Sequence, residues 1–495
     1  MLSYKNVYMR KILNKLFIAL LLGACITLAS CSGNEDNKTP VETPVETPVK
    51  TPVEEIKCPV CAGKSQAKQK TYEPVSHTPT TFKEDSVDFT TVTICEGVKQ
   101  STYYFTLNNG NTAMVVATEV DLKYASIAAG NSENALIMKN VTTPYAQATA
   151  FEKATGYTVV AAVNGDFFGG STPVNAFVKD SVIIKKAHND NRIYDYKNLN
   201  ADLPASMPML FGVSGSTAQI APIIYNDSVE KTVKSELYYE LEYYHDGARS
   251  TISKDVVFNK SNIQKNNINM VYEQGSTITT ALGSTVLKLA LHEPYGQRYH
   301  GEVIEIITIE EDKTKFKTEN NTGYLIIPAT FAFSEEDFAI GDTISYHVTS
   351  SDGTWKYYDN IIGCRQELVR EGKVVPTVKL ENSNGAQSTN IPRTAIGVMP
   401  DGKVVIFSVE SLRYGKKSNS SSDPYGLNLP ELADFMCYYG VASGANFDGG
   451  GSTQLLTRLT PTSDFKVIVR SSDTGSTNVK DTRAVVNTVL VYIKK

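Results

Sequence analysis

Short strand-like segments separated by turn residues dominate the chain from about Val98 onward. Residues 101–107 and 112–120 are rich in apolar and β-branched residues, and Asn108-Asn109-Gly110 between them is typical of a hairpin. Further strands are expected at 157–163, at 484–493 and, as a series of short ones, between 214 and 352. Apolar residues at helical spacing predict helices at 135–155 and 429–439. We therefore expect an α+β fold, a single large domain of mixed β-sheets packed with a few helices.

The N-terminus has the pattern of an export signal. Two lysines precede an apolar run, residues 16–27, which is too short to span a membrane. Leu28-Ala29-Ser30-Cys31 then resembles a bacterial lipobox, which implies cleavage before Cys31 and lipidation of that residue. Cys25 is a weaker rival, and an ordinary signal peptide with a chance cysteine is the alternative. We expect residues 1–30 to be a lipoprotein signal peptide and the protein to be exported to the cell envelope, at the outer membrane or cell surface.

Residues 31–97 are predicted to tether the protein to its lipid anchor. The motif Thr-Pro-Val-Glu begins at Thr39 and recurs with small changes up to Glu54, and a proline at every fourth residue prevents a helix or a central strand. Cys58 and Cys61 follow as a single CxxC pair without a second pair or a nearby histidine. A local disulfide or two unreactive thiols is therefore preferred to a zinc site.

The charge of the chain bears on its partners. A formal net charge of -5 and a pI near 5.8, with no basic run, argue against nucleic acid. The lipid anchor is the one membrane contact that we expect. The acidic and amide residues show no calcium-loop spacing, so no metal and no cofactor are expected.

The segment Asn446-Phe447-Asp448-Gly449-Gly450-Gly451-Ser452 places three glycines between an acid and a hydroxyl. Glycine costs backbone entropy, and one reason for three in a row is close approach of the backbone to a ligand. Successive unhindered N–H groups can form a concave site for an anion, and Asp448 could act as a base or nucleophile beside it. A tight turn between a helix and a strand is the alternative.

Two other motifs carry groups of the same chemistry. Asn164-Gly165-Asp166-Phe167-Phe168 follows a predicted buried strand and adds a second acid. Pro392-Arg393-Thr394 precedes another strand, and the guanidinium of Arg393 suits two oxygens of a phosphate. For Arg393 the alternative is a surface ion pair, for Asn164 and Asn446 it is bonding to a turn backbone, and for Phe167 and Phe168 it is the core.

Taken in order, these motifs resemble the phosphodiester glycosidase family. The resemblance covers about residues 98–495, which we therefore expect to form the glycosidase domain. Its motifs are Asn164–Phe168, Asn360–Gly363 with Leu368–Gly372, Pro392–Gly397, the helix at 429–436, Asn446–Ser452, and Arg483 with Asn487. The chain departs from the family where Asp-Gly-Arg usually follows the strand after Pro-Arg-Thr. Here Glu410-Ser411-Leu412-Arg413 stands, and Glu410 and Arg413 could replace the Asp and Arg.

The resemblance implies hydrolysis of a sugar-1-phosphodiester at the glycosidic bond, with N-acetylglucosamine-1-phosphodiesters or related phosphoglycans as substrates. The enzyme must then hold the phosphate and position a water or a carboxylate nucleophile. The candidate catalytic acids are Asp166, Asp448 and Glu410, whose separate roles the sequence leaves open. The candidate substrate and phosphate ligands are Asn164, Arg393, Thr394, Asn446, Gly449, Gly450, Gly451, Ser452 and Arg483. Two alternatives stay open, a glycan-binding protein without catalysis and a phosphodiesterase that cleaves the P–O bond.

Overall fold

A computed structural model describes most of the chain that carries these motifs. The described residues are 67, 69–186, 209–222, 226–227, 232–233, 237–245, 248–253, 256–259, 263, 266–271, 275, 277–291, 300–310, 314–319, 322–331, 337–350, 352–375, 389–415 and 423–494. The signal peptide, Cys31, the repeats and the Cys58–Cys61 pair predicted above lie outside them. Of the helices within them, none is both long and apolar enough to cross a membrane.

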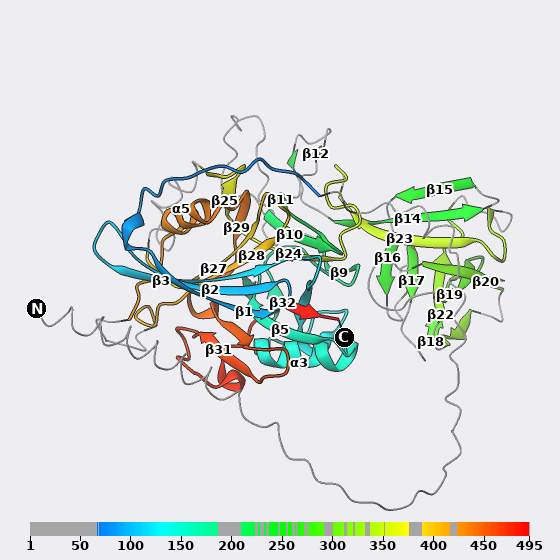
Figure 1. The fold of residues 1–495 in the computed structure, drawn as a ribbon. Helices are drawn as coiled ribbons and strands as arrows, with labels where there is room; N and C mark the ends of the chain where they lie inside the picture. Colours follow the sequence, from blue (N-terminus) through cyan, green and yellow to red (C-terminus); the bar gives the residue numbers. More distant parts are fainter. Residues whose placement is uncertain are drawn as a thin grey trace, which may run out of the picture. The chain divides into compact units, whose positions relative to one another are not determined.

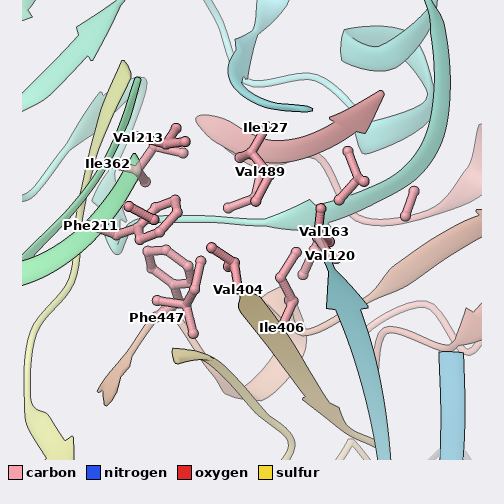
Figure 2. Packing of buried hydrophobic residues seen from close by; sticks show 14 of the residues in the cluster. Val120, Ile127, Val163, Phe211, Val213, Ile362, Val404, Ile406, Phe447 and Val489 are labelled. Atoms are coloured by element: carbon pink, nitrogen blue, oxygen red, sulfur yellow. The ribbon is translucent and has the colours of Figure 1, made fainter. Parts of the chain in front are cut away.

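Two antiparallel sheets line one apolar core, to which Phe211, Val213 and Ile362 of a third sheet also contribute (Figures 1 and 2). The first has the order β1 (Asp88–Cys95), β2 (Val98–Thr106), β3 (Thr112–Val120), β28 (Val404–Val409), β27 (Arg393–Val398), β29 (Ser443–Asn446), β25 (Glu367–Arg370) and β26 (Lys373–Val374). The second has the order β31 (Phe465–Val469), β30 (Leu455–Arg458), β5 (Thr158–Asn164), β32 (Asn487–Ile493) and β4 (Ser126–Asn131).

The central strands of both sheets, such as β3, β28, β27, β5 and β32, are mostly buried on both faces, which explains their continuous apolar sequences. In β3, Val116 enters the core shared with the second sheet, whereas Val115 faces the opposite side and packs with the second helix, α5 (Leu429–Tyr439). In β5, Val160 enters the shared core and Val159 packs with the first helix, α3 (Pro144–Thr155). The order of layers is therefore helix, sheet, sheet, helix.

Capping residues define where the two helices begin and end. Thr143 accepts a hydrogen bond from the Ala146 N–H, and Gly156 ends α3 with a φ of 73°. Asn428 and Glu431 form a reciprocal capping box at the start of α5. The helix predicted at 135–155 was too long, because Pro144 occupies the first turn of α3. Short 3-10 turns lie at η1 (Glu84–Ser86), η2 (Ser132–Asn134), η6 (Gly450–Ser452) and η7 (Val479–Asp481).

The remaining strands form two further sheets and three pairs. One sheet has the order β11 (Thr217–Pro222), β10 (Met209–Ser214), β24 (Asn360–Gly363), β8 (Phe177–Lys179) and β9 (Val182–Lys185). The other has the order β15 (Ala248–Ser253), β14 (Tyr238–His245), β23 (Thr343–Thr349), β20 (His300–Thr308), β19 (Thr285–Leu291), β22 (Thr322–Ile327), β17 (Ile268–Val271) and β16 (Val256–Asn259). The pairs are β12 (Asn226–Asp227) with β13 (Thr232–Val233), β18 (Thr277–Thr279) with β21 (Lys315–Lys317), and β6 (Phe168–Gly169) with β7 (Thr172–Pro173).

The expectation of a sheet-rich fold with few helices is confirmed. The predicted limit of the tether at residue 97 is not supported, because β1 lies before it and pairs along its length with β2. The other domain boundaries stay predictions. Among the described cysteines, Cys95, Cys364 and Cys437 are free thiols.

Replacement of Phe447 by alanine should destabilise the protein strongly. Phe447 is fully buried in the core between the two sheets (Figure 2) and stands between the site residues Asn446 and Asp448. Loss of a buried phenylalanine ring costs about 3–5 kcal/mol. Chemical denaturation should show this loss of unfolding free energy, whereas Ile340→Ala, at a side chain that is 70% exposed, should change it little. Equal effects of the two substitutions would contradict this packing.

Candidate active site

The two Gly/Asp loops predicted from the sequence meet at the ends of β5 and β29, which belong to opposite sheets. The Asp448 N–H donates to the Gly165 carbonyl over 3.0 Å. The side-chain amide of Asn164 donates to the Asp448 carbonyl over 2.8 Å. Residues about 280 positions apart are therefore held in one constellation.

Hydrogen bonds of the Asn164 and Thr394 side chains connect these loops. Asn164 Oδ1 accepts hydrogen bonds from Thr394 Oγ1 at 2.8 Å and from the Gln454 N–H at 3.2 Å. Both side chains are buried. Their contact with substrate stays a prediction. The hydrogen bonds of these two side chains position the backbone and side chains of the loops.

Asp166 lies beneath the surface and is held by Asn175. The Asn175 N–H donates to Asp166 Oδ2 over 2.8 Å, and Asn175 Nδ2 donates to Oδ1 over 2.6 Å. Burial raises the pKa of Asp166 to about 7, although the Asn175 bonds and the charge of Lys185 oppose the shift. The negative charge of Asp448 adds to it. Near neutral pH this carboxyl is therefore poised between its two protonation states.

Asp448 is half-buried and more accessible than Asp166. Burial raises its pKa to about 6, while a hydrogen bond from Ser452 and the positive charges of Arg483 and Arg365 lower it. The Gly449 N–H also donates to Asp448 Oδ1, over 3.0 Å. At neutral pH Asp448 is mostly ionised, so one carboxylate stands beside a carboxyl that holds its proton more firmly.

Three N–H groups in and beside the glycine run bond within the protein, and the anion contact predicted for the run stays a prediction. The Gly449 N–H bonds to Asp448, the Gly450 N–H to the Pro392 carbonyl at 2.8 Å, and the Ser452 N–H to the Gly449 carbonyl at 3.2 Å. Close approach does require the glycines, because a Cβ on Gly451 would lie 2.0 Å from Asp473 Oδ1. The space next to Gly451 is therefore occupied by the Asp473 side chain of the same protein.

Two arginines face Asp448, and each lies over one ring of the Asn164–Phe168 loop. The guanidinium carbon of Arg365 is 5.5 Å from the centre of the Phe167 ring, and that of Arg483 is 5.7 Å from the centre of the Phe168 ring. Both rings are half-buried, so neither is a fully buried core residue. Arg483 also pairs with Asp473. This geometry gathers positive charge at the outer side of Asp448.

Arg393 differs from these arginines in being almost fully buried. Its Nε donates to the Leu427 carbonyl at 3.0 Å and its Nη2 to the Thr389 carbonyl at 3.2 Å. Burial lowers its pKa to about 10. The described contacts of Arg393 therefore go to backbone, and its phosphate contact stays a prediction.

Glu410 holds a neighbouring loop through Arg470. Arg470 Nη2 donates to Glu410 Oε1 at 2.7 Å, and the Arg470 N–H donates to Oε2 at 2.8 Å. The next residue, Ser471, donates from its hydroxyl to the Gly451 carbonyl. Glu410 thus acts on the glycine run through this loop, and its contacts include neither aspartate. Arg413 bonds to the Tyr425 hydroxyl at 2.7 Å, so the two residues that replace the family motif have different partners.

Asn446 is buried, and its Nδ2 donates to Gln366 Oε1 over 3.0 Å. Four residues of the site were not predicted from the sequence, namely Arg365, Asn175, Lys185 and Asp473. Arg365 stands only two residues beyond the matched Asn360–Gly363 motif, which was a usable signal. Asn175 and Asp473 reach the site from loops without a distinctive pattern.

Stability should fall as pH rises through the range in which Asp166 ionises. Its folded pKa of about 7 exceeds the ordinary value of 3.8, so its favourable contribution is complete below about pH 4 and lost as pH approaches 7. The change is on the order of 2–4 kcal/mol, and Asp448 contributes in the same direction.

Denaturation of the wild type and Asp166→Asn at pH 5 and pH 8 checks this difference. The variant should lose less stability than the wild type on going to pH 8, whatever constant cost the amide brings. Asp401→Asn is the control, because the pKa of exposed Asp401 is lowered by Lys403, so its contribution has the opposite sign. Parallel curves for the wild type and Asp166→Asn would refute the pKa assigned to Asp166.

Part of the chain that contains this site matches a known protein family. Residues 307–492 match the family model of the phosphodiester glycosidases. This range contains Arg365, Arg393, Glu410, Asp448 and Arg483, whereas the loop with Asp166 precedes it. No curated protein matches the chain.

Three solved structures are similar at low sequence identity. A hypothetical protein from Synechocystis is 15% identical with a TM-score of 0.43; the match covers 83% of this chain and 64% of that protein, so the chain spans somewhat less than two thirds of it. A Burkholderia pseudomallei protein described as exported is 13% identical, with a TM-score of 0.42 and coverages of 86% and 100%. The zebrafish N-acetylglucosamine-1-phosphodiester alpha-N-acetylglucosaminidase catalytic domain is 12% identical, with a TM-score of 0.37 and coverages of 86% and 89%.

These structural likenesses support no statement about activity. The family match, by contrast, confirms the resemblance that the motifs predicted, over the range that it covers. Residues 307–492 of the chain therefore match the phosphodiester glycosidase family.

Proposed function

We propose that the protein is an exported hydrolase that cleaves the bond between C1 of a sugar and the oxygen of a phosphodiester. N-acetylglucosamine-1-phosphodiesters and related phosphoglycans are the expected substrates. The observation that carries this proposal is the coupled pair Asp166 and Asp448 with two arginines beside it. The family match over residues 307–492 supports the reaction class.

The phosphate fits best at Arg365 and Arg483. Both guanidinium groups act on Asp448 electrostatically, and Phe167 and Phe168 support them from one side. The phosphate monoester released from the substrate is a good leaving group, so cationic stabilisation of its developing charge matters more than strong proton donation. The ion pair between Arg483 and Asp473 shows that this guanidinium accepts an anionic partner, and the substrate phosphate would compete with Asp473 for it.

Asp448 is the acid that we assign to the reacting carbon, because it is ionised at neutral pH and less buried than Asp166. It would take a proton from the attacking water while the water oxygen bonds to C1. The electrons of the C1–O bond then leave with the phosphate monoester. Asp166 would keep a proton next to Asp448 and limit the charge in the site. Glu410 would act as a positioning residue through Arg470.

Glycan binding without catalysis is the alternative that specific observations favour. Asp473 already pairs with Arg483, and the segment from Glu410 to Arg413 departs from the family motif. Cleavage of the P–O bond is a further alternative that the same assay distinguishes. For the cellular location, we propose an anchor at a lipidated Cys31, with the domain at the outer membrane or cell surface.

Asp448→Asn should abolish hydrolysis of α-N-acetylglucosamine-1-phospho-methyl ester. Loss of a general base lowers kcat by about 10²–10⁴-fold. Release of free sugar and methyl phosphate is the measurement, and Asp166→Asn should also reduce it. Asp401→Asn, an exposed acid in a turn, is the matched control and should retain activity.

Reaction in oxygen-18 water identifies the bond that breaks. Label in the sugar supports the proposal, and label in the phosphate shows P–O cleavage. Binding of the ester without turnover, unchanged in Asp448→Asn, would establish the glycan-binding alternative and refute the hydrolase.

Arg483→Gln should shift the acid limb of the pH profile of kcat/KM to higher pH. Arg483 lowers the pKa of Asp448, so its removal raises that pKa and demands a higher pH for ionisation. KM should also rise through loss of a phosphate contact. Arg370→Gln removes an arginine that pairs with Glu367 instead and is the control. An unshifted acid limb in Arg483→Gln would contradict the assignment of Asp448 as the ionised acid.

A further inference from the structure

A second cluster of charged side chains lies on the sheet that contains β14 and β23. Glu240 and Glu242 are two residues apart on β14, so their side chains are on the same face of the sheet. His347 on β23 is directly opposite Glu240 in the strand register. Within the described part of the chain, these three residues are a group that offers three potential metal ligands within 4.8 Å of one another.

The distances in this Glu–Glu–His cluster are close to those of a ligand set. His347 Nε2 is 3.0 Å from Glu240 Oε1, and His347 Nδ1 is 4.0 Å from Glu242 Oε1. Metal bonds to histidine nitrogen and carboxylate oxygen are about 2.0–2.2 Å long, so two ligands of one ion lie up to about 4 Å apart. Small side-chain rotations would bring one imidazole nitrogen and both carboxylates onto one ion.

His347 gives an independent indication that a ligand belongs here. Its side chain is only 2% exposed, yet neither ring nitrogen has a hydrogen-bond partner of acceptable direction in the described structure, despite the short contact with Glu240. The contact with Glu240 therefore has poor hydrogen-bond direction, and a metal bond would satisfy the ring nitrogen better.

A cation of the protein already lies at the cluster. Lys356 Nζ contacts Glu240 and lies 3.8 Å from Glu242 Oε1, so one ammonium is close to both carboxylates. The Lys356 side chain is 30% exposed and has a route to solvent. A divalent ion would neutralise both carboxylates and release this lysine to water.

We propose that Glu240, Glu242 and His347 bind a divalent transition-metal ion, in exchange with the ammonium of Lys356. One imidazole with two carboxylates suits Zn²⁺ or Mn²⁺ better than Mg²⁺ or Ca²⁺, which prefer oxygen ligands alone. Three protein ligands leave at least one position for water. The ion would cross-link β14 to β23, and the site involves none of the residues assigned to hydrolysis.

Zinc binding to the metal-free full-length protein tests this site, by isothermal titration in a Cys58→Ser/Cys61→Ser background that removes the competing thiol pair. The background protein should bind one Zn²⁺, and Glu242→Gln and His347→Gln should each weaken binding about 100-fold. Lys356→Met should strengthen it about 10-fold, because the internal competitor is gone. His245→Gln is the matched control, since His245 lies on the same strand but pairs with Asp342 at 2.9 Å.

Thermal unfolding with and without Zn²⁺ gives a second readout. A ligand that binds only the folded state raises Tm, and the increase should be lost in Glu242→Gln and enlarged in Lys356→Met. Equal zinc affinity in the background protein, His347→Gln and Lys356→Met would overturn the proposal. If Glu242→Gln or His347→Gln fails to fold, an unchanged affinity in Lys356→Met alone would still overturn it.

Discussion

The hydrogen bond from the Asp448 N–H to the Gly165 carbonyl joins the ends of two strands that belong to opposite sheets. Asn164 strengthens this junction, because its amide binds the Asp448 carbonyl and its Oδ1 accepts from Thr394 and Gln454. The two-sheet core orients both strands, and this junction holds the loops of the two aspartates together. The negative charge of Asp448 adds to the pKa of Asp166 because the two loops meet there.

The two aspartates of the site differ in their burial and in the charges around them. Asp166 lies deep, where two bonds from Asn175 hold it and burial favours its proton. Asp448 lies nearer the surface, where Arg365 and Arg483 favour its ionised form. The phenylalanines of one loop support both arginines, so the segment that buries one acid also arranges the cations around the other. The glycine run contributes one N–H donor to Asp448, that of Gly449, and space for Asp473.

Local pattern predicted much of this arrangement. The hairpin at residues 101–120, the helix at 429–439 and the two Gly/Asp loops were all visible, because turn residues and capping signals act over a few positions. The partners of the glycine N–H groups were not, because they depend on which carbonyls the fold brings near. Arg365 was missed for the same reason. The Glu–Glu–His cluster joins residues 107 positions apart, from Glu240 to His347, that no motif connects.

Strand β24 contributes side chains to two hydrophobic cores. In β24, Ile362 packs in the core between the two main sheets, while its neighbour Ile361 packs in the core that includes residues of β14 and β23. The same strand continues into Gly363, where a Cβ would lie 2.7 Å from Asp166 Oδ2, and then to Arg365. Because adjacent side chains of a strand point in opposite directions, β24 is packed against a hydrophobic core on each of its two faces. A change in the packing of either core would therefore act on Gly363, which lies against Asp166, and on the segment that leads to Arg365.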